Sequence, residues 1–169
     1  MLIILGGLPG VGKTTLAREL ARQTGAVHVR IDSIEQALRE TGARGGPMDD
    51  AGYRVAYAVA ADNLRLGRSV VADCVNPVSA TRQAWRAVAA AVPVAAVEVE
   101  VVCSDAAEHR RRVETRAVDV PGLVPPTWAE IEAEVRTGGY EPWDRARIIV
   151  DTARGSLAQA VRALRGQLG

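Results

Sequence analysis

Apolar residues along the chain form short runs that alternate with longer stretches of helical spacing. The short runs predict five strands, at residues 2–5, 27–31, 69–73, 94–102 and 147–150. Spacings of three and four residues predict helices at 14–23, from residue 34 onward, and at 50–66, 77–91, 105–117, 127–136 and 156–168. Strands that alternate with helices in this way are typical of a parallel sheet with helices on both faces. The predicted fold class is therefore α/β, a three-layer sandwich.

The whole chain, residues 1–169, is expected to form one domain. Its length lies within the range of a single domain, and its 48% hydrophobic and 24% charged residues are typical of globular proteins. Segments rich in glycine and proline predict loops at 40–49 and 118–126. Neither segment has the character of a linker, and the sequence contains no internal repeat.

Charge and cysteine content narrow the classes of partner. The formal net charge is +1, so the chain lacks the excess positive charge that holds nucleic acids through counterion release. The opening apolar run, 1–5, is too short for a signal peptide or a membrane span, and no other segment reaches about 18 apolar residues. Cys74 and Cys103 are isolated and lack the spacing of zinc ligands. Two such cysteines are expected to be reduced residues of the core. We expect a cytoplasmic protein without membrane contact, and the net charge argues against nucleic-acid binding unless a local basic cleft provides it.

Residues 7–14, GLPGVGKT, match the phosphate-binding pattern G-x-x-x-x-G-K-[ST], the Walker A motif. Glycines in such a loop let backbone N–H groups point at phosphate oxygens, and the following helix contributes the positive end of its dipole. Lys13 is expected to reach the β- and γ-phosphates, and the Thr14 hydroxyl to ligate Mg²⁺. The predicted nucleotide contacts are Gly7, Pro9, Gly10, Val11, Gly12, Lys13, Thr14 and Thr15.

The single lysine of the chain, Lys13, lies in this motif, and the other 20 of the 21 basic residues are arginines. A compact ammonium suits a position between phosphates. An Asn-Lys-x-Asp element, which selects GTP, cannot be present because it needs a second lysine. Hydrolytic ATPases usually place a glutamate after the magnesium-associated aspartate of a buried strand, but here Cys74 follows Asp73. The sequence therefore favours phosphoryl transfer to an acceptor other than water.

Taken in order, these landmarks resemble a group of small P-loop kinases. The group comprises zeta toxins, chloramphenicol phosphotransferase, gluconate kinase and the kinase domain of polynucleotide kinases, together with uncharacterised AAA-type ATP-binding kinases. The resemblance covers nearly the whole chain, and the phosphate loop is its most specific part. It implies a P-loop fold with strand order 2-3-1-4-5, ATP and Mg²⁺ as cofactors, and transfer of the γ-phosphate to a hydroxyl of a small-molecule acceptor.

The resemblance also implies roles for polar residues at the ends of two strands. Asp32, just after the second strand, corresponds to the general base that accepts the proton of the acceptor hydroxyl; the alternative is a helix cap. Asp73, at the end of the third strand, would hold either the acceptor hydroxyl or Mg²⁺ through water. Asn76 follows on the same edge of the sheet and would either bind the acceptor or form the turn before Pro77.

An arginine-rich helix and the loop after it predict a lid at about residues 110–126. The i, i+4 spacing places Arg112 and Arg116 on one helical face. In similar kinases such a pair closes over the transferring phosphoryl group and neutralises its charge; the alternative is a solvated basic face. Thr152, after the fifth strand, falls where these kinases run backbone past the adenine.

The acceptor side of the site departs from the polynucleotide kinases. They place an arginine three residues after the base, where this chain has Glu35. Because an acid repels phosphate, Glu35 favours a neutral or cationic acceptor. Tyr53 and Tyr57, one helical turn apart, either line the acceptor pocket or pack in the core. The same two interpretations apply to the aromatic group of Trp128, Tyr140 and Trp143.

The sequence thus predicts an ATP- and Mg²⁺-dependent phosphotransferase, with two alternatives. A nucleic-acid 5′-hydroxyl kinase would need a basic groove beside Asp32. A non-enzymatic ATP-binding switch would bind nucleotide without phosphorylating an acceptor, and it would lack an enclosed second pocket. No pattern in the sequence names the acceptor or the oligomeric state.

Overall fold

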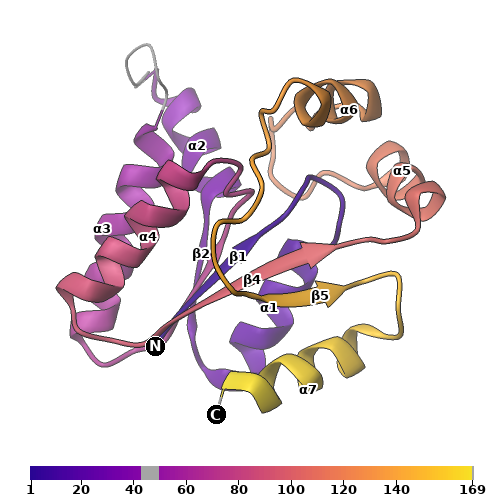
Figure 1. Ribbon diagram of the computed structural model, residues 1–169. Helices are drawn as coiled ribbons and strands as arrows, with labels where there is room; N and C mark the ends of the chain where they lie inside the picture. The colour runs from indigo at the N-terminus through magenta and orange to yellow at the C-terminus, as the bar shows by residue number, and fades with distance from the viewer. Residues whose placement is uncertain (43–49, 169) are drawn as a thin grey trace.

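Five parallel strands form a single sheet in the order β2-β3-β1-β4-β5, which confirms the predicted fold class and strand order (Figure 1). The computed structural model describes residues 1–42 and 50–168, so most of the loop predicted at 40–49 lies outside the described residues. The strands are β1 (Leu2–Gly6), β2 (Val27–Arg30), β3 (Val70–Asp73), β4 (Ala96–Val102) and β5 (Ile148–Asp151).

Helices connect the strands and cover both faces of the sheet. In the described residues they are α1 (Lys13–Thr24), α2 (Ile31–Glu40), α3 (Ala51–Arg65), α4 (Ser79–Ala91), α5 (Ala106–Thr115), α6 (Trp128–Arg136) and α7 (Leu157–Leu168). None of these helices is long and apolar enough to cross a membrane.

The core consists of two apolar layers, one on each face of the sheet. Every residue of β1 is buried, as expected for a central parallel strand that reads as an unbroken apolar run. Because strand side chains alternate between faces, Ile3 and Leu5 pack with residues of α1 and α7, whereas Leu2 and Ile4 pack with residues of α3 and α4. The largest fully buried side chain is that of Trp85, in the second layer.

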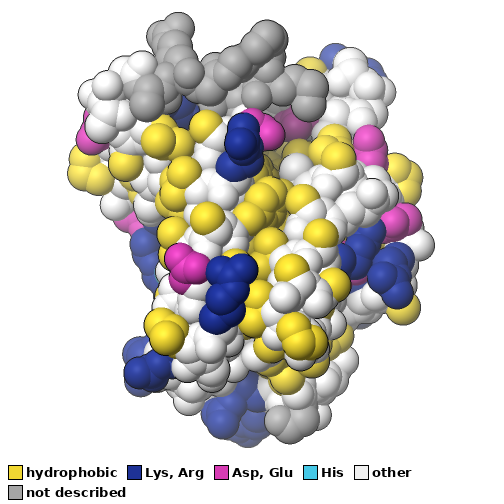
Figure 2. Space-filling view, turned by 90° about the vertical axis from the view of Figure 1, so that its left-hand side faces the viewer, with side chains coloured by type: hydrophobic (Ala, Val, Ile, Leu, Met, Phe, Trp, Pro, Cys, Tyr) yellow, Lys and Arg dark blue, Asp and Glu magenta, His cyan; other side chains and the backbone are white. Residues whose placement is uncertain are grey.

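Figure 2 shows the face of the molecule on the side of α3 and α4, where apolar side chains run between a few charged ones. Val55 and Val59 of α3 contribute to the exposed apolar surface. Neither residue lines the cavity described below.

Among the helix boundaries that differ from the prediction, two concern candidate site residues. β2 ends at Arg30 and α2 begins at Ile31, so Asp32 lies within the first helical turn. No side chain caps this helix, so the alternative interpretation of Asp32 as a cap is wrong. α5 ends at Thr115, and Arg116 has an extended backbone with φ −62° and ψ 136°. The prediction that Arg116 shares a helical face with the arginine four residues before it is therefore also wrong.

The parallel register brings the candidate residues to one edge of the sheet. Leu5 of β1 and Arg30 of β2 both pair with Asp73 of β3, so these three strands end at the same level. The loop after β1 and the start of α2 therefore lie on either side of Asp73. Ligand sites of open parallel sheets lie at this carboxyl edge.

Candidate active site

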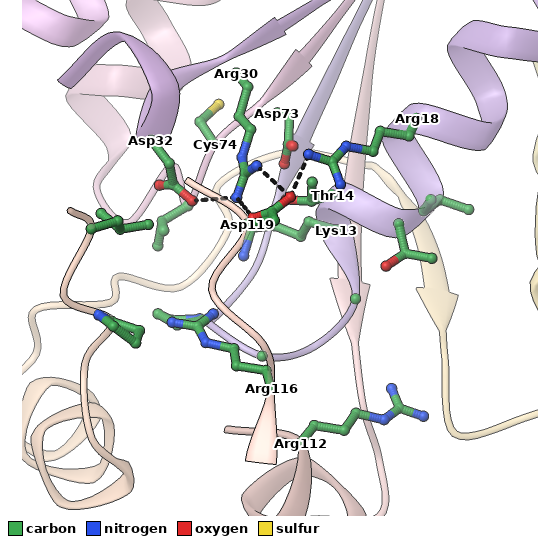
Figure 3. A pocket seen from close by; sticks show the side chains of 18 of the residues that line it. Lys13, Thr14, Arg18, Arg30, Asp32, Asp73, Cys74, Arg112, Arg116 and Asp119 are labelled. Atoms are coloured by element: carbon green, nitrogen blue, oxygen red, sulfur yellow. Dashed lines mark hydrogen bonds and ion pairs between the residues drawn. The ribbon is translucent and has the colours of Figure 1, made fainter. Parts of the chain in front are cut away.

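A cavity of about 950 Å³ lies at the carboxyl edge of the sheet. Its wall combines the loop before α1, the first turns of α1 and α2, the end of β3, parts of the segment between α5 and α6, and residues after β5. Figure 3 shows the charged side chains that gather in it. The cavity brings together these predicted site residues: Pro9, Gly10, Gly12, Lys13, Thr14, Thr15, Asp32, Glu35, Asp73, Arg112, Arg116 and Thr152.

The loop between β1 and α1 has the backbone shape of a phosphate cradle. Gly7, Gly10 and Gly12 have φ values of 139°, 85° and 99°, which side chains rarely allow. A Cβ atom on Gly7 would lie 2.2 Å from the carbonyl oxygen of Val101, and one on Gly10 would lie 2.4 Å from a methyl group of Val113. Both positions therefore require glycine. The first turn of α1 contains no acidic residue, so no carboxylate there competes with phosphate for the helix N-terminus.

Lys13, the first residue of α1, is buried, and its Nζ donates to the carbonyl oxygen of Leu8 at 2.8 Å across the loop. Burial lowers the pKa of Lys13, and the charges of Asp73 and Asp32 oppose this shift. A buried ammonium beside the Thr14 hydroxyl, at the N-terminus of a helix, is a donor set that fits a polyphosphate.

Asp73 is buried, and its Oδ2 lies 3.1 Å from Nε2 of His28, a residue of β2 that the sequence reasoning missed. In the described part of the chain, no group of three His, Cys, Asp or Glu residues could hold a metal ion. The two residues predicted to hold Mg²⁺, Thr14 and Asp73, both line the cavity, where water and phosphate oxygens would complete the coordination. Few protein ligands are usual for Mg²⁺ at phosphate sites.

Asp32 projects from the first turn of α2 into the cavity, with 44% of its side chain exposed. Its Oδ2 lies 3.4 Å from Nη2 of Arg30, the last residue of β2. The carboxylate is thus held beside a cation and remains accessible to a ligand. Figure 3 shows Asp32 on the side of the cavity opposite to Arg18 and α1.

Arg112 and Arg116 differ in the contacts that they already make. Arg112 donates through Nε to Glu108 at 2.7 Å, and through Nη1 and Nη2 to the hydroxyl and carbonyl oxygens of Thr152 at 2.8 and 3.2 Å. The Arg116 guanidinium makes no hydrogen bond or ion pair with any residue that the structure describes. Desolvation lowers the pKa of Arg116, and the charge of Asp32 opposes this shift. The two side chains extend in opposite directions in Figure 3, which leaves Arg116 available to a ligand.

α5, the helix in which the predicted lid begins, is anchored to the phosphate loop at two points. Thr152 accepts from Arg112 of α5 and donates its hydroxyl to the carbonyl oxygen of Val11 at 2.7 Å. Nε2 of His109, also on α5, lies 2.8 Å from the carbonyl oxygen of Pro9. The sequence reasoning missed His109, because a lone histidine in an arginine-rich helix carries no spacing signal.

Asp119, in the irregular segment between α5 and α6, joins arginines from two other elements. Its carboxylate accepts from Nη1 and Nη2 of Arg30 at 3.0 and 3.1 Å, and from Nη2 of Arg18 on α1 at 2.5 Å. These bonds, first that of Arg30, lower the pKa of Asp119 to about 2. The sequence reasoning missed all three residues. The only local signal was Arg30 two positions before Asp32, a cation next to a candidate base.

Four predicted contacts lie outside the cavity wall: Gly7, Val11, Tyr53 and Asn76. Gly7 shapes the loop, and the Val11 side chain is buried in the core. Asn76 is fully buried with a φ of 50°; its Nδ2 donates to the carbonyl oxygen of Leu5 at 2.8 Å, and its backbone N–H donates to the Tyr53 hydroxyl at 3.2 Å. Tyr53 and Asn76 thus brace the loop after β3, which favours the alternative interpretations of both residues, packing for Tyr53 and turn formation for Asn76.

The other aromatic candidates also pack away from the cavity. Tyr57 meets Trp85 edge to face, with ring centroids 4.6 Å apart. The buried Arg82 guanidinium lies over the ring of Trp143, with its central carbon 4.5 Å from the ring centroid. Nε1 of Trp143 donates to the Tyr140 hydroxyl. Trp128 packs edge to face against the histidine of α5. For each of these aromatic residues, the packing interpretation applies.

Solved structures of similar fold include three with informative descriptions. A protein of Chloroflexus aurantiacus with a provisional kinase assignment has a TM-score of 0.77 and 20% identity, over 99% of this chain and 98% of that chain. Kti12 of Chaetomium thermophilum, in complex with ADP-AlF3, has a TM-score of 0.71 and 21% identity, over 100% of both chains. APS kinase of Mycobacterium tuberculosis, in complex with AMPPNP and APS, has a TM-score of 0.67 and 19% identity, over 99% of this chain and 96% of that chain. The likenesses show a fold of the P-loop kinase type.

A search of curated proteins gave no match. The AAA domain family matches residues 2–126, well over half of the chain. The matched range contains the phosphate loop, Asp32, Asp73 and the predicted lid segment, and it does not single out the zeta-toxin or chloramphenicol phosphotransferase group. On this match, the chain belongs to the AAA domain family.

Proposed function

We propose that this protein is an ATP- and Mg²⁺-dependent kinase that phosphorylates a hydroxyl group of a small-molecule acceptor. The acceptor oxygen attacks the γ-phosphorus and forms the new O–P bond, while the bond from this phosphorus to the β–γ bridging oxygen breaks and ADP leaves. Asp32 takes the hydroxyl proton. The fold supports this reading, and APS kinase and a gluconokinase of Sinorhizobium meliloti are among the similar structures.

A single cavity lined by both the phosphate loop and Asp32 is the observation that carries the proposal. The wall continues past the loop to Gln36 and Arg39 of α2 and to residues 122–126. A second ligand would therefore have room beside the nucleotide, within reach of the candidate base. A non-enzymatic switch has no need for this second compartment.

The contacts described above support a separate role for each residue of the nucleotide half. Lys13 and the loop amides would hold the phosphates, and Thr14 and Asp73 would hold Mg²⁺, which neutralises phosphate charge when bound. Arg116, which has no partner among the described residues, would stabilise the charge that develops on the transferring group. Arg112 would act indirectly, because its bonds to Glu108 and Thr152 fix α5 next to the phosphate loop.

The test is transfer from γ-labelled ATP to a panel of acceptors: nucleosides, sugars, sugar acids, aminoglycosides, phenicols and 5′-hydroxyl oligonucleotides. The Lys13→Ala variant serves as the blank, because it removes the ammonium from the phosphate loop. We expect a labelled small-molecule product with the wild type that is absent from the blank. Tight ATP binding without any labelled product would support the switch instead, and a labelled oligonucleotide alone would support the nucleic-acid kinase.

A further inference from the structure

Arg30 is an arginine at the wall of the cavity whose side chain is largely buried. Only 10% of its side chain is exposed, and its Nε is buried without a hydrogen-bond partner among the described residues. A buried guanidinium is costly unless it is paired. Its two terminal nitrogens meet both oxygens of Asp119 at 3.0 and 3.1 Å, the bidentate geometry that arginine adopts with carboxylate, sulfate or phosphate groups.

The carboxylate on Arg30 comes from an irregular segment that lines the cavity. Asp119 is 43% exposed, and it also accepts from Arg18 of α1. Figure 3 shows Asp119 between the two arginines, close to Lys13 and Thr14 of the phosphate loop. The two guanidiniums thus come from different elements and meet at one point inside the cavity. The Asp119 carboxylate occupies this point, where an anionic ligand could otherwise bind.

The charge of the cavity wall also favours an anionic ligand. Cationic side chains outnumber acidic ones in it: the former are Lys13, Arg18, Arg30, Arg39, Arg112, Arg116 and Arg154, the latter Asp32, Glu35, Asp73 and Asp119. Glu35 was the basis for predicting a neutral or cationic acceptor. In the structure, its Oε2 forms an ion pair with Nη2 of Arg39 at 3.3 Å. Its charge is therefore balanced locally and does not by itself repel an anion from Arg30.

We propose, building on the proposed kinase function, that the acceptor carries a carboxylate, sulfate or phosphate group that binds Arg30 and Arg18 in place of Asp119. One guanidinium nitrogen of Arg30 lies 3.4 Å from Asp32, so an anionic group on Arg30 positions a neighbouring hydroxyl close to the candidate base. Asp119 is then an internal competitor, and the segment that carries it leaves the two arginines when the acceptor binds.

Isothermal titration of sulfate into protein saturated with Mg²⁺ and the ATP analogue AMP-PNP tests this inference, because the analogue fills the phosphate loop. The Asp119→Asn variant removes the internal carboxylate and should bind sulfate about tenfold more tightly than the wild type, because sulfate then no longer competes with the charge-assisted hydrogen bonds that Asp119 accepts from Arg30 and Arg18. Asp62→Asn is the matched control, because Asp62 is an exposed residue of α3 paired only with Arg65 in the described structure. A gain in affinity cannot come from misfolding.

The double variant with Asp119→Asn and Arg30→Met should not show the increase in sulfate affinity over the wild type. The Asp62→Asn control should bind sulfate with the affinity of the wild type. Equal sulfate affinity in the two Asn variants, or a gain that survives Arg30→Met, would overturn the inference. A separate titration of AMP-PNP into the protein with Mg²⁺, made before the sulfate titrations, records nucleotide binding. Its absence would refute the proposed function and this inference together, whereas AMP-PNP binding without the sulfate difference overturns this inference alone.

Discussion

Replacing Arg116 by methionine tests the division of labour between the two lid arginines. Methionine keeps much of the aliphatic volume and removes the charge. Arg116 has no side-chain partner among the described residues, so its full charge is available to the transferring phosphoryl group. Arg112 already donates hydrogen bonds to Glu108 at 2.7 Å and to Thr152 at 2.8 Å, so much of its charge is compensated before a ligand binds.

The size of the effect follows from these surroundings. Removing one preorganised donor to a transition-state oxygen typically costs about 10²–10³ in kcat. Arg116 is exposed at the cavity before a ligand binds, where water screens part of its charge, so we expect the lower end, about 10²-fold. For Arg112→Met we expect less than about tenfold in kcat, together with a raised KM for ATP and a lower Tm, because the contact between α5 and Thr152 is lost.

Steady-state kinetics with the acceptor found by the labelling panel measures both effects, and Arg110→Met is the matched control. Arg110 is an exposed arginine of α5 that pairs with Glu114 and does not line the cavity, so its replacement should leave kcat unchanged. An Arg116→Met variant with near-normal kcat, or an Arg112→Met variant with the larger loss, would refute the assignment.

Three further predictions concern the base, the phosphate loop and the lid. Asp32→Asn should lower kcat by about 10²–10⁴ and leave ADP affinity unchanged in a calorimetric titration; near-normal turnover would remove Asp32 from the role of base. Gly7→Ala should abolish nucleotide binding and lower the free energy of unfolding by about 1–3 kcal/mol in urea denaturation, because the new Cβ meets the backbone of Val101. Gly166→Ala, in α7 with no atom within 4 Å of the added Cβ apart from its chain neighbours and the nearby backbone of its own helix, should not destabilise, and equal losses in both alanine variants would contradict the steric argument. Asp119→Asn should lower Tm at pH 6 by about 1–3 °C, since its ion pairs are partly exposed. The pKa of Asp119 is lowered from 3.8 to about 2, so this stabilisation is present above about pH 4 and is lost as the pH falls towards 2; a Tm difference that persists at pH 2 would contradict this.

The sequence determined the parts of this protein that depend on neighbouring residues in the chain. The strand-and-helix alternation predicted the α/β class, and the order β2-β3-β1-β4-β5 followed from the resemblance. The phosphate loop was readable because its glycines, Lys13 and Thr14 act within one turn, between a strand and a helix. Asp32 and Asp73 could be placed at the same edge because parallel strands end together.

The lid and the acceptor side were decided by tertiary structure. The helical pattern ran on to residue 117, but α5 ends at Thr115, and only the fold shows that Arg116 is without a described partner while the other lid arginine is bound. From the sequence, Asn76 could equally bind the acceptor or form a turn. Its hydrogen bonds with Leu5 and Tyr53 show that it supports the loop after β3, outside the cavity wall.

The charges that face the acceptor come from residues far apart in the chain. Arg30 and Asp119 are separated by 89 positions, and Arg18 and Asp119 by 101. No periodicity or motif connects such residues, because their contact depends on where the segment after α5 crosses the edge of the sheet. Local pattern therefore determined the nucleotide half of the site, whereas long-range packing determined its acceptor half.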